Sequence, residues 1–149
     1  MLKYTLNKTI LEIKMNVIRV AAKALIVKNN QVLILQRKRN SPNDKIEWDI
    51  PGGGIEYGES FSDALVREVT EETNLTVEVF DTIRAWNCID NDKMLYGVTF
   101  ATNFIEGDII LSSEHENYVW FDIDKIANSD VAKWIKDEVA ILQKRIMER

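Results

Sequence analysis

The sequence has almost none of the residues that build disulfides, zinc sites or multi-histidine centres. Its 149 residues include one cysteine, Cys88, and one histidine, His115. A single thiol forms no intrachain disulfide and no cysteine-based zinc site, and a single imidazole excludes a multi-histidine metal centre. The lone thiol agrees with a reducing compartment, so we expect a cytoplasmic protein. We also expect Cys88 to be a small buried hydrophobe and His115 to have a structural role.

Long hydrophobic runs are missing as well. No segment approaches the roughly 20 apolar residues that span a bilayer, and residues 1–16 alternate apolar and polar side chains rather than resembling a signal peptide. We therefore expect no membrane partner. Acidic side chains outnumber basic ones by 24 to 19, a net charge of −5. This acidic balance predicts no binding to duplex nucleic acid.

The residues that are present suit one globular domain. Hydrophobic residues make up 46% of the chain and charged residues 29%, which is enough apolar material for a core. The length also fits one domain. We divide the chain into an N-terminal extension, residues 1–16, and a single domain, residues 17–149. For the extension, a strand and a loose segment fit the pattern equally well.

Hydrophobic periodicity predicts a mixture of strands and helices. The predicted strands cover residues 17–28, 31–37, 76–89, 94–105 and 118–121, and the predicted helices cover residues 60–73 and 131–147. Asn29-Asn30 and residues 90–92 are turn signals. Ser60 is a good N-cap, and Asn74 suits a left-handed residue that ends a helix. This mixture predicts an α/β or α+β fold.

The most informative stretch is residues 53–75. Glu68, Glu71 and Glu72 stand at i, i+3 and i+4, so their carboxylates share one helix face and repel each other unless cations compensate. Carboxylates without cysteine or several histidines are hard oxygen ligands that suit Mg²⁺ or Mn²⁺. Glycines at 52–54 let a ligand approach the backbone, and the basic residues 37–39 offer phosphate contacts. Together these features indicate metal-assisted chemistry on a phosphate anhydride.

The spacing of this stretch resembles the Nudix box. The matching pattern is Gly53-x5-Glu59-x7-Arg67-Glu68-Val69-x-Glu71-Glu72-x-Asn74-Leu75. It departs from the family at Asn74, where the family has glycine, and asparagine is the next most tolerant residue of a left-handed conformation. The flanking segments, residues 48–53 and 114–120, are similar to the family as well.

The resemblance implies a Nudix fold, an α/β/α sandwich around a mixed β-sheet with a loop–helix–loop catalytic box. It implies a Mg²⁺- or Mn²⁺-dependent pyrophosphohydrolase acting on a small nucleotide. We expect a MutT-like enzyme that cleaves a nucleoside triphosphate or a related compound to the monophosphate and pyrophosphate. Homodimers are common in this fold, so a second copy of the chain is a possible partner.

The resemblance also implies roles for individual residues. The metal ligands are Glu68, Glu71 and Glu72. Arg67 orients a carboxylate, and Gly53 and Glu59 support the box. The general base varies in the family, and here it is a box glutamate or Glu114 on a distant loop. The residues expected at the substrate phosphates are Arg37, Arg39, Gly53 and Gly54.

Other interpretations stay open. The acidic helix face could be merely solvated, and residues 37–39 could be an exposed strand end. Nucleotide sugars, dinucleoside polyphosphates and ADP-ribose are alternative substrates, although the proline that many ADP-ribose pyrophosphatases carry after the box is missing. Residues 114–120 are also similar to dihydroneopterin triphosphate pyrophosphatases. A non-catalytic nucleotide-binding or sensor module and an isomerase are more remote alternatives.

Aromatic side chains divide into two groups. We expect the indoles of Trp48, Trp120 and Trp134 in the core. Trp86 and Tyr96 fit either the core or the substrate pocket, because strands that follow the box can line the pocket in this family.

Overall fold

The structure, a computed structural model, describes residues 17–149. The extension predicted for residues 1–16 lies outside the described residues, and the division of the chain at residue 17 stays a prediction. The strands are β1 Ile18–Lys28, β2 Gln31–Arg37, β3 Trp48–Asp49, β4 Gly52–Gly54, β5 Thr76–Asp90, β6 Lys93–Glu106 and β7 His115–Asp122. The helices are α1 Phe61–Thr73 and α2 Lys133–Met147, with a 3₁₀ turn η1 at Ile126–Asn128.

The strands form one mixed sheet in the order β3-β2-β1-β6-β5, with β4 beside β1 and β7 beside β2. The long strands β1 and β6 run parallel, and the other pairs are antiparallel. β1 and β2 pair only near their connecting turn, at Val27–Val32 and Lys28–Gln31. Beyond that turn β4 takes the place beside β1, which brings the glycine run against the middle of the sheet.

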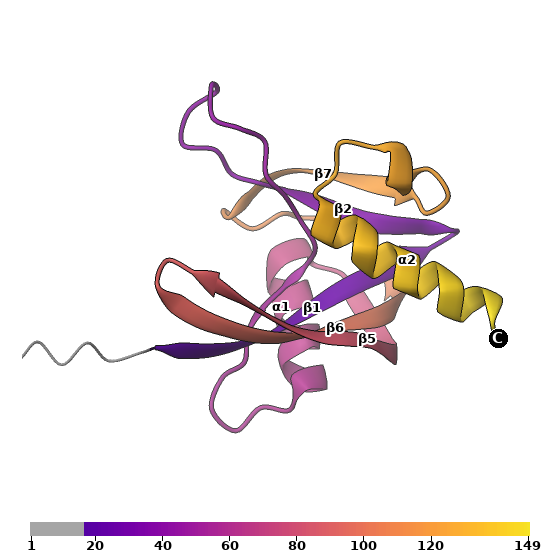
Figure 1. Cartoon of the computed structure of the whole chain (residues 1–149), viewed down its shortest axis with the longest axis horizontal. Helices are drawn as coiled ribbons and strands as arrows, with labels where there is room; N and C mark the ends of the chain where they lie inside the picture. Colours follow the sequence, from indigo (N-terminus) through magenta and orange to yellow (C-terminus); the bar gives the residue numbers. More distant parts are fainter. Residues whose placement is uncertain (1–16) are drawn as a thin grey trace, which may run out of the picture.

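The two helices cover opposite faces of this sheet, with α2 in front and α1 behind in the view of Figure 1. Side chains along β1 alternate between the two faces of the sheet. Ala24 and Ile26 pack toward α1, and Leu25 packs toward α2. The apolar stripe of α1 includes the buried side chain of Val69, and the apolar stripe of α2 includes the buried side chain of Ile135. These two cores confirm the predicted α/β/α sandwich with a mixed sheet.

Local signals in the sequence are confirmed at the element ends. Asn29 and Asn30 have φ angles of 49° and 60°, as a tight hairpin turn requires. The Ser60 hydroxyl accepts a hydrogen bond from the Asp63 backbone N–H at 3.1 Å, and Asn74 ends α1 with a φ of 61°. The short strands β3 and β4 have no alternating pattern of their own, so the sequence does not predict them.

Two side chains predicted to be buried lie at the surface. Cys88 is exposed because it lies in the distal part of the β5–β6 hairpin, opposite Leu95 and close to the turn. Trp134 is 40% exposed, since its neighbour Ile135 takes the inward position on α2. Trp48 and Trp120 agree better with the prediction, because both pack half-buried against the cores.

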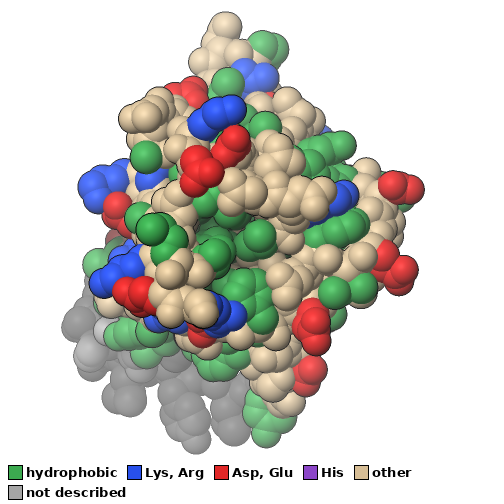
Figure 2. All heavy atoms as spheres, turned by 90° about the vertical axis from the view of Figure 1, so that its right-hand side faces the viewer, with side chains coloured by type: hydrophobic (Ala, Val, Ile, Leu, Met, Phe, Trp, Pro, Cys, Tyr) green, Lys and Arg blue, Asp and Glu red, His purple; other side chains and the backbone are tan. Residues whose placement is uncertain are grey.

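In the view of Figure 2, hydrophobic side chains gather in the middle of the face and charged side chains lie mostly around them. Near the end of β1, the Lys28 ammonium covers the Phe104 ring at 4.0 Å from its centroid. No helix within residues 17–149 is long and apolar enough to cross a membrane.

Gly52 is the glycine on which the close approach of β4 to β1 depends. Its φ is +135°, and a Cβ there would lie 2.1 Å from the Ala22 carbonyl oxygen. We expect Gly52→Ala to lower the free energy of unfolding by about 2–4 kcal/mol in urea denaturation. The matched control is Gly54→Ala, where a Cβ would meet nothing within 4 Å. Equal losses in the two variants would contradict this explanation.

Candidate active site

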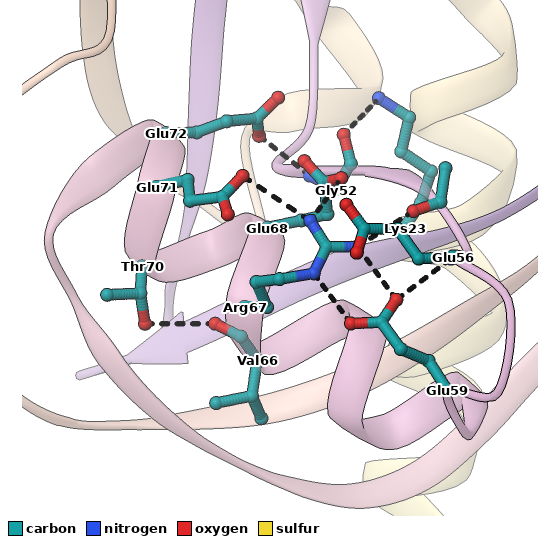
Figure 3. Close-up of polar contacts among 11 residues, drawn as sticks. Lys23, Gly52, Glu56, Glu59, Val66, Arg67, Glu68, Thr70, Glu71 and Glu72 are labelled. Atoms are coloured by element: carbon teal, nitrogen blue, oxygen red, sulfur yellow. Dashed lines mark hydrogen bonds and ion pairs between the residues drawn. The ribbon is translucent and has the colours of Figure 1, made fainter.

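Arg67 contacts several carboxylates on α1 and the loop before it (Figure 3). We call this group, Arg67 with Glu59, Glu68 and Glu71, the Arg67 fan. The Nε of Arg67 donates to Glu59 Oε1 at 2.6 Å and its Nη2 to Glu59 Oε2 at 2.9 Å. Its Nη1 donates to Glu68 at 2.9 Å and to Glu71 at 3.4 Å. The Nη2 group also reaches the Gly54 carbonyl at 3.0 Å. One guanidinium therefore offsets the repulsion that the sequence predicts among these carboxylates.

Glu59 connects the loop to the helix. The hydrogen bond from Arg67 and a second one from the Glu56 backbone N–H lower the pKa of Glu59 to about 2. Its carboxylate thus stays ionised across the physiological range and holds Arg67 in place. This geometry is what a supporting role for Glu59 requires.

Glu72 is the buried carboxylate of the cluster, only 6% exposed. Its Oε2 accepts a hydrogen bond from the Gly52 backbone N–H at 2.8 Å. Burial raises its pKa to about 7; that hydrogen bond and the charge of Lys23 oppose the rise, and Asp49 and Glu68 add to it. A cation beside Glu72 would favour the ionised form.

The glycine run shapes the space beside these carboxylates. A Cβ at Gly53 would lie 2.6 Å from the Glu68 carboxyl group, so the missing side chain makes room for it. On the other side of the run, the Lys23 ammonium holds Asp49 at 3.0 Å and donates to the Ile50 and Gly52 carbonyls at 3.1 and 3.4 Å. Lys23 thus fixes the segment whose backbone N–H binds Glu72.

The two arginines expected at the substrate phosphates already bind carboxylates. Arg37 contacts Asp49 at 2.7 Å, and Arg39 contacts Glu116 at 2.6 Å. Burial alone would raise the pKa of Asp49. The charges of Lys23 and Arg37 nevertheless hold that pKa below its usual range. Arg37 nevertheless keeps 57% of its side chain exposed, so its remaining donors can reach a ligand.

Glu114 lies in the exposed turn that precedes β7. The loop before it is tied to the end of α1, since the Ser112 backbone N–H donates to the Glu72 carbonyl at 3.0 Å and the Ile110 N–H to the Thr73 carbonyl at 3.0 Å. The fold therefore brings the loop of Glu114 to the helix that carries the box glutamates. Its side chain is free of the Arg67 fan.

A cavity of about 710 Å³ opens on the α2 side of the sheet. Its walls come from residues 45–49, from residues 84–90 of β5 and from the first half of α2, and Lys23 and Asp49 connect it with the α1 network. Its size suits a ligand of nucleotide dimensions. Trp86 lines this cavity, whereas Tyr96 follows the lining residue Leu95 and alternates to the opposite face.

Several residues of this site were missed at the sequence level. Lys23, Asp49 and Glu138 all line the cavity. Trp86, which is already named from the sequence, has a second signal in the sequence, because a glycine within a strand indicates a close approach. A Cβ at Gly97 would lie 2.2 Å from the indole of Trp86, its partner across the β5–β6 pair.

The carboxylates of α1 fit a hard divalent cation by their chemistry. Glu68, Glu71 and Glu72 supply oxygen ligands, as Mg²⁺ prefers. Within residues 17–149, however, no three acidic, histidine or cysteine side chains converge as a ready metal site. Glu71 is the carboxylate most free to join one, because it is 58% exposed and its contact with Arg67, at 3.4 Å, is the longest of the fan.

Comparison with known proteins agrees with this geometry. The NUDIX domain model matches residues 17–142. An ADP-ribose pyrophosphatase of Methanocaldococcus jannaschii is 30% identical over 122 residues, covering 79% of this chain and 71% of that protein. An oxidized purine nucleoside triphosphate hydrolase of Danio rerio is 32% identical over 115 residues, covering 76% and 70%. The crystal structure of a MutT protein from Methanosarcina mazei Go1 matches with a TM-score of 0.75 and 27% identity, covering 87% and 96%.

The fold and the carboxylate fan define a class of enzymes that hydrolyse phosphoanhydride bonds. The chain belongs to the Nudix family and is a Nudix pyrophosphohydrolase. The family implies a substrate of nucleotide type, and its members typically use a divalent metal ion.

The titration of Glu72 predicts a pH effect on stability in the metal-free protein. The carboxyl group has an ordinary pKa of 4.5 and a pKa of about 7 when folded. Between these values the folded state binds more protons than the unfolded state. The free energy of unfolding should therefore fall as the pH rises from about 4.5 to about 7, by up to roughly 3 kcal/mol.

This pH effect is measured by urea denaturation in EDTA across that pH range. Glu72→Gln is the matched variant, because the amide oxygen can still accept the Gly52 N–H and does not titrate. We expect a flatter pH profile in the variant. Identical profiles would show that Glu72 does not titrate in this window.

Proposed function

We propose that this protein is a MutT-like hydrolase that converts a nucleoside triphosphate or a related triphosphate to the monophosphate and pyrophosphate. In this proposal a Mg²⁺ or Mn²⁺ ion is held by Glu68, Glu71 and Glu72. Arg67 orients Glu68, and Glu59 and Gly53 support the box.

One observation carries the proposal. The buried carboxylate of Glu72 accepts a hydrogen bond from the Gly52 backbone N–H, and Lys23, which binds the Gly52 carbonyl, lines a cavity of nucleotide size. Burying a carboxylate without a cation is costly. A bound divalent ion and the phosphates of a substrate would neutralise each other at this point.

The reaction needs water to attack one phosphorus while the anhydride oxygen leaves. A bound divalent ion would neutralise phosphate charge and lower the pKa of the attacking water. Glu114, or a box glutamate, accepts the proton that this water loses. Arg37 and Arg39, together with the backbone at Gly53 and Gly54, steady the phosphates.

Glu72→Gln is the decisive variant for this chemistry. We expect the rate of Mg²⁺-dependent hydrolysis to fall about a hundredfold or more, because the amide supplies no negative charge to the cation. The assay pairs the protein with canonical and oxidised nucleoside triphosphates, ADP-ribose, nucleotide sugars and dinucleoside polyphosphates. The substrate with the highest kcat/KM then decides among these alternatives.

Asp63→Asn is the matched control for Glu72→Gln. Asp63 lies on the same helix, is exposed, and stands outside the Arg67 fan. This variant should keep the wild-type rate. Near-wild-type hydrolysis by Glu72→Gln would overturn the assignment, and silence of the wild type on every anhydride would favour a non-catalytic nucleotide-binding module.

Cys88 offers a test of where the nucleotide binds. It is the only thiol of the chain and it lines the cavity. A bound nucleoside monophosphate should shield it, so we expect alkylation by iodoacetamide to slow about tenfold at a concentration ten times the Kd. Intact-protein mass spectrometry measures the rate, with pyrophosphate alone as the control. An unchanged rate at nucleotide concentrations that inhibit hydrolysis would move the binding site elsewhere.

A further inference from the structure

The wall of the cavity contains a buried acid that the proposed chemistry does not use. Glu138 on α2 is 1% exposed and lines the cavity together with Arg84 of β5. Arg84 Nε donates to Glu138 Oε1 at 2.7 Å, and the Arg84 side chain is 41% exposed. The pair therefore joins a buried acceptor to a solvent-accessible donor.

The second oxygen of this carboxylate is the unusual one. Glu138 Oε2 is buried and has no hydrogen-bond partner among residues 17–149. Burial raises the pKa of Glu138, against the lowering effects of the Arg84 guanidinium and the Thr99 hydroxyl. Since buried polar atoms nearly always find partners, an unpaired acceptor on a residue of the cavity wall indicates a donor that arrives with a ligand.

A flat aromatic surface stands in the same wall. The Trp86 indole lies against Gly97, where any side chain would collide with it, and its Nε1 donates to the Thr99 hydroxyl at 3.0 Å. These two contacts hold the ring in one orientation. An indole fixed in this way offers a planar ligand a surface for stacking.

We propose that this wall selects a guanine-type ring: Trp86 stacks on the ring, and Glu138 Oε2 accepts a hydrogen bond from its adjacent ring N–H and amino groups. This inference rests on the proposed function, because it names the base that the same cavity binds.

The donor pattern of the bases supports this choice. Guanine and pterin rings present a ring N–H next to an amino group, which are two donors side by side. Uracil and thymine flank their single N–H with carbonyl oxygens, and adenine places a lone pair beside its amino group. Each of these would set a lone pair against the carboxylate, so the site disfavours them.

The wild-type protein alone supplies the first test. GTP and ITP differ by the 2-amino group, so we expect kcat/KM for GTP to exceed that for ITP by about tenfold or more. UTP should be poorer still. Guanine nucleotides and a pterin triphosphate present the same pair of donors, a ring N–H next to an amino group. The compound with the lower KM identifies which of the two ring types the protein uses.

Glu138→Gln supplies the second test. We expect the GTP-to-ITP ratio to fall toward one, because the amide lacks the charge that favours two donors. Asp137→Asn is the matched control: Asp137 lies next to Glu138 on α2, has 44% of its side chain exposed, and pairs with Lys133. It removes the same charge and should leave the ratio unchanged.

A binding assay separates this inference from the proposed function. Quenching of tryptophan fluorescence by GMP and IMP, measured without divalent cation, reports base selection independently of hydrolysis. Tighter GMP binding without any hydrolysis would support the Glu138 inference and overturn the proposed reaction. Hydrolysis with equal kcat/KM for GTP and ITP, or a Glu138→Gln variant that weakens all bases alike, would overturn the inference and leave the reaction standing.

Discussion

The structure of the site depends on how one helix tolerates three carboxylates on the same face. Like charges at i, i+3 and i+4 repel, and the structure offsets this repulsion in two ways. Glu68 and Glu71 share the guanidinium of Arg67, which Glu59 holds from the preceding loop. The buried carboxylate of Glu72 instead accepts a hydrogen bond from the Gly52 backbone N–H. The repulsion is thus offset by one cation and one backbone dipole, and the remaining negative charge makes the site receptive to a divalent ion.

Lys23 extends this arrangement through the sheet. Its ammonium binds Asp49 and the carbonyls of the segment that ends at Gly52, so the glycine strand on the α1 side and the cavity on the α2 side share one set of contacts. This is possible because β1 and β2 separate after their turn and admit β3 and β4 between their far ends. In the proposed function, this separation would let the phosphates and the rest of a substrate be bound from two faces of one sheet.

The parts predictable from the sequence are those that depend on neighbours in the chain. The caps of α1, the two asparagine-containing turns and the carboxylate face follow from spacings of a few residues. The contacts that complete the site join distant positions: Lys23 and Asp49 are 26 residues apart, Gly52 and Glu72 are 20 apart, and Arg84 and Glu138 are 54 apart. No local pattern marks such pairs. Cys88 was wrongly predicted to be buried because hydrophobicity alone does not reveal where a hairpin extends past the helices. Trp134 was wrongly predicted to be buried because its neighbour Ile135 takes the inward position on α2.

This separation of near and distant contacts has a consequence for substrate choice. The box network lies on α1 and the loops at its ends, and in the proposed function it contacts the phosphoanhydride whatever base the substrate carries. The cavity wall is built from β5, β6 and α2, where Trp86 depends on Gly97 and Glu138 depends on Arg84. Under the proposed base selection, changes there would alter the base that fits and leave the carboxylates of α1 in place.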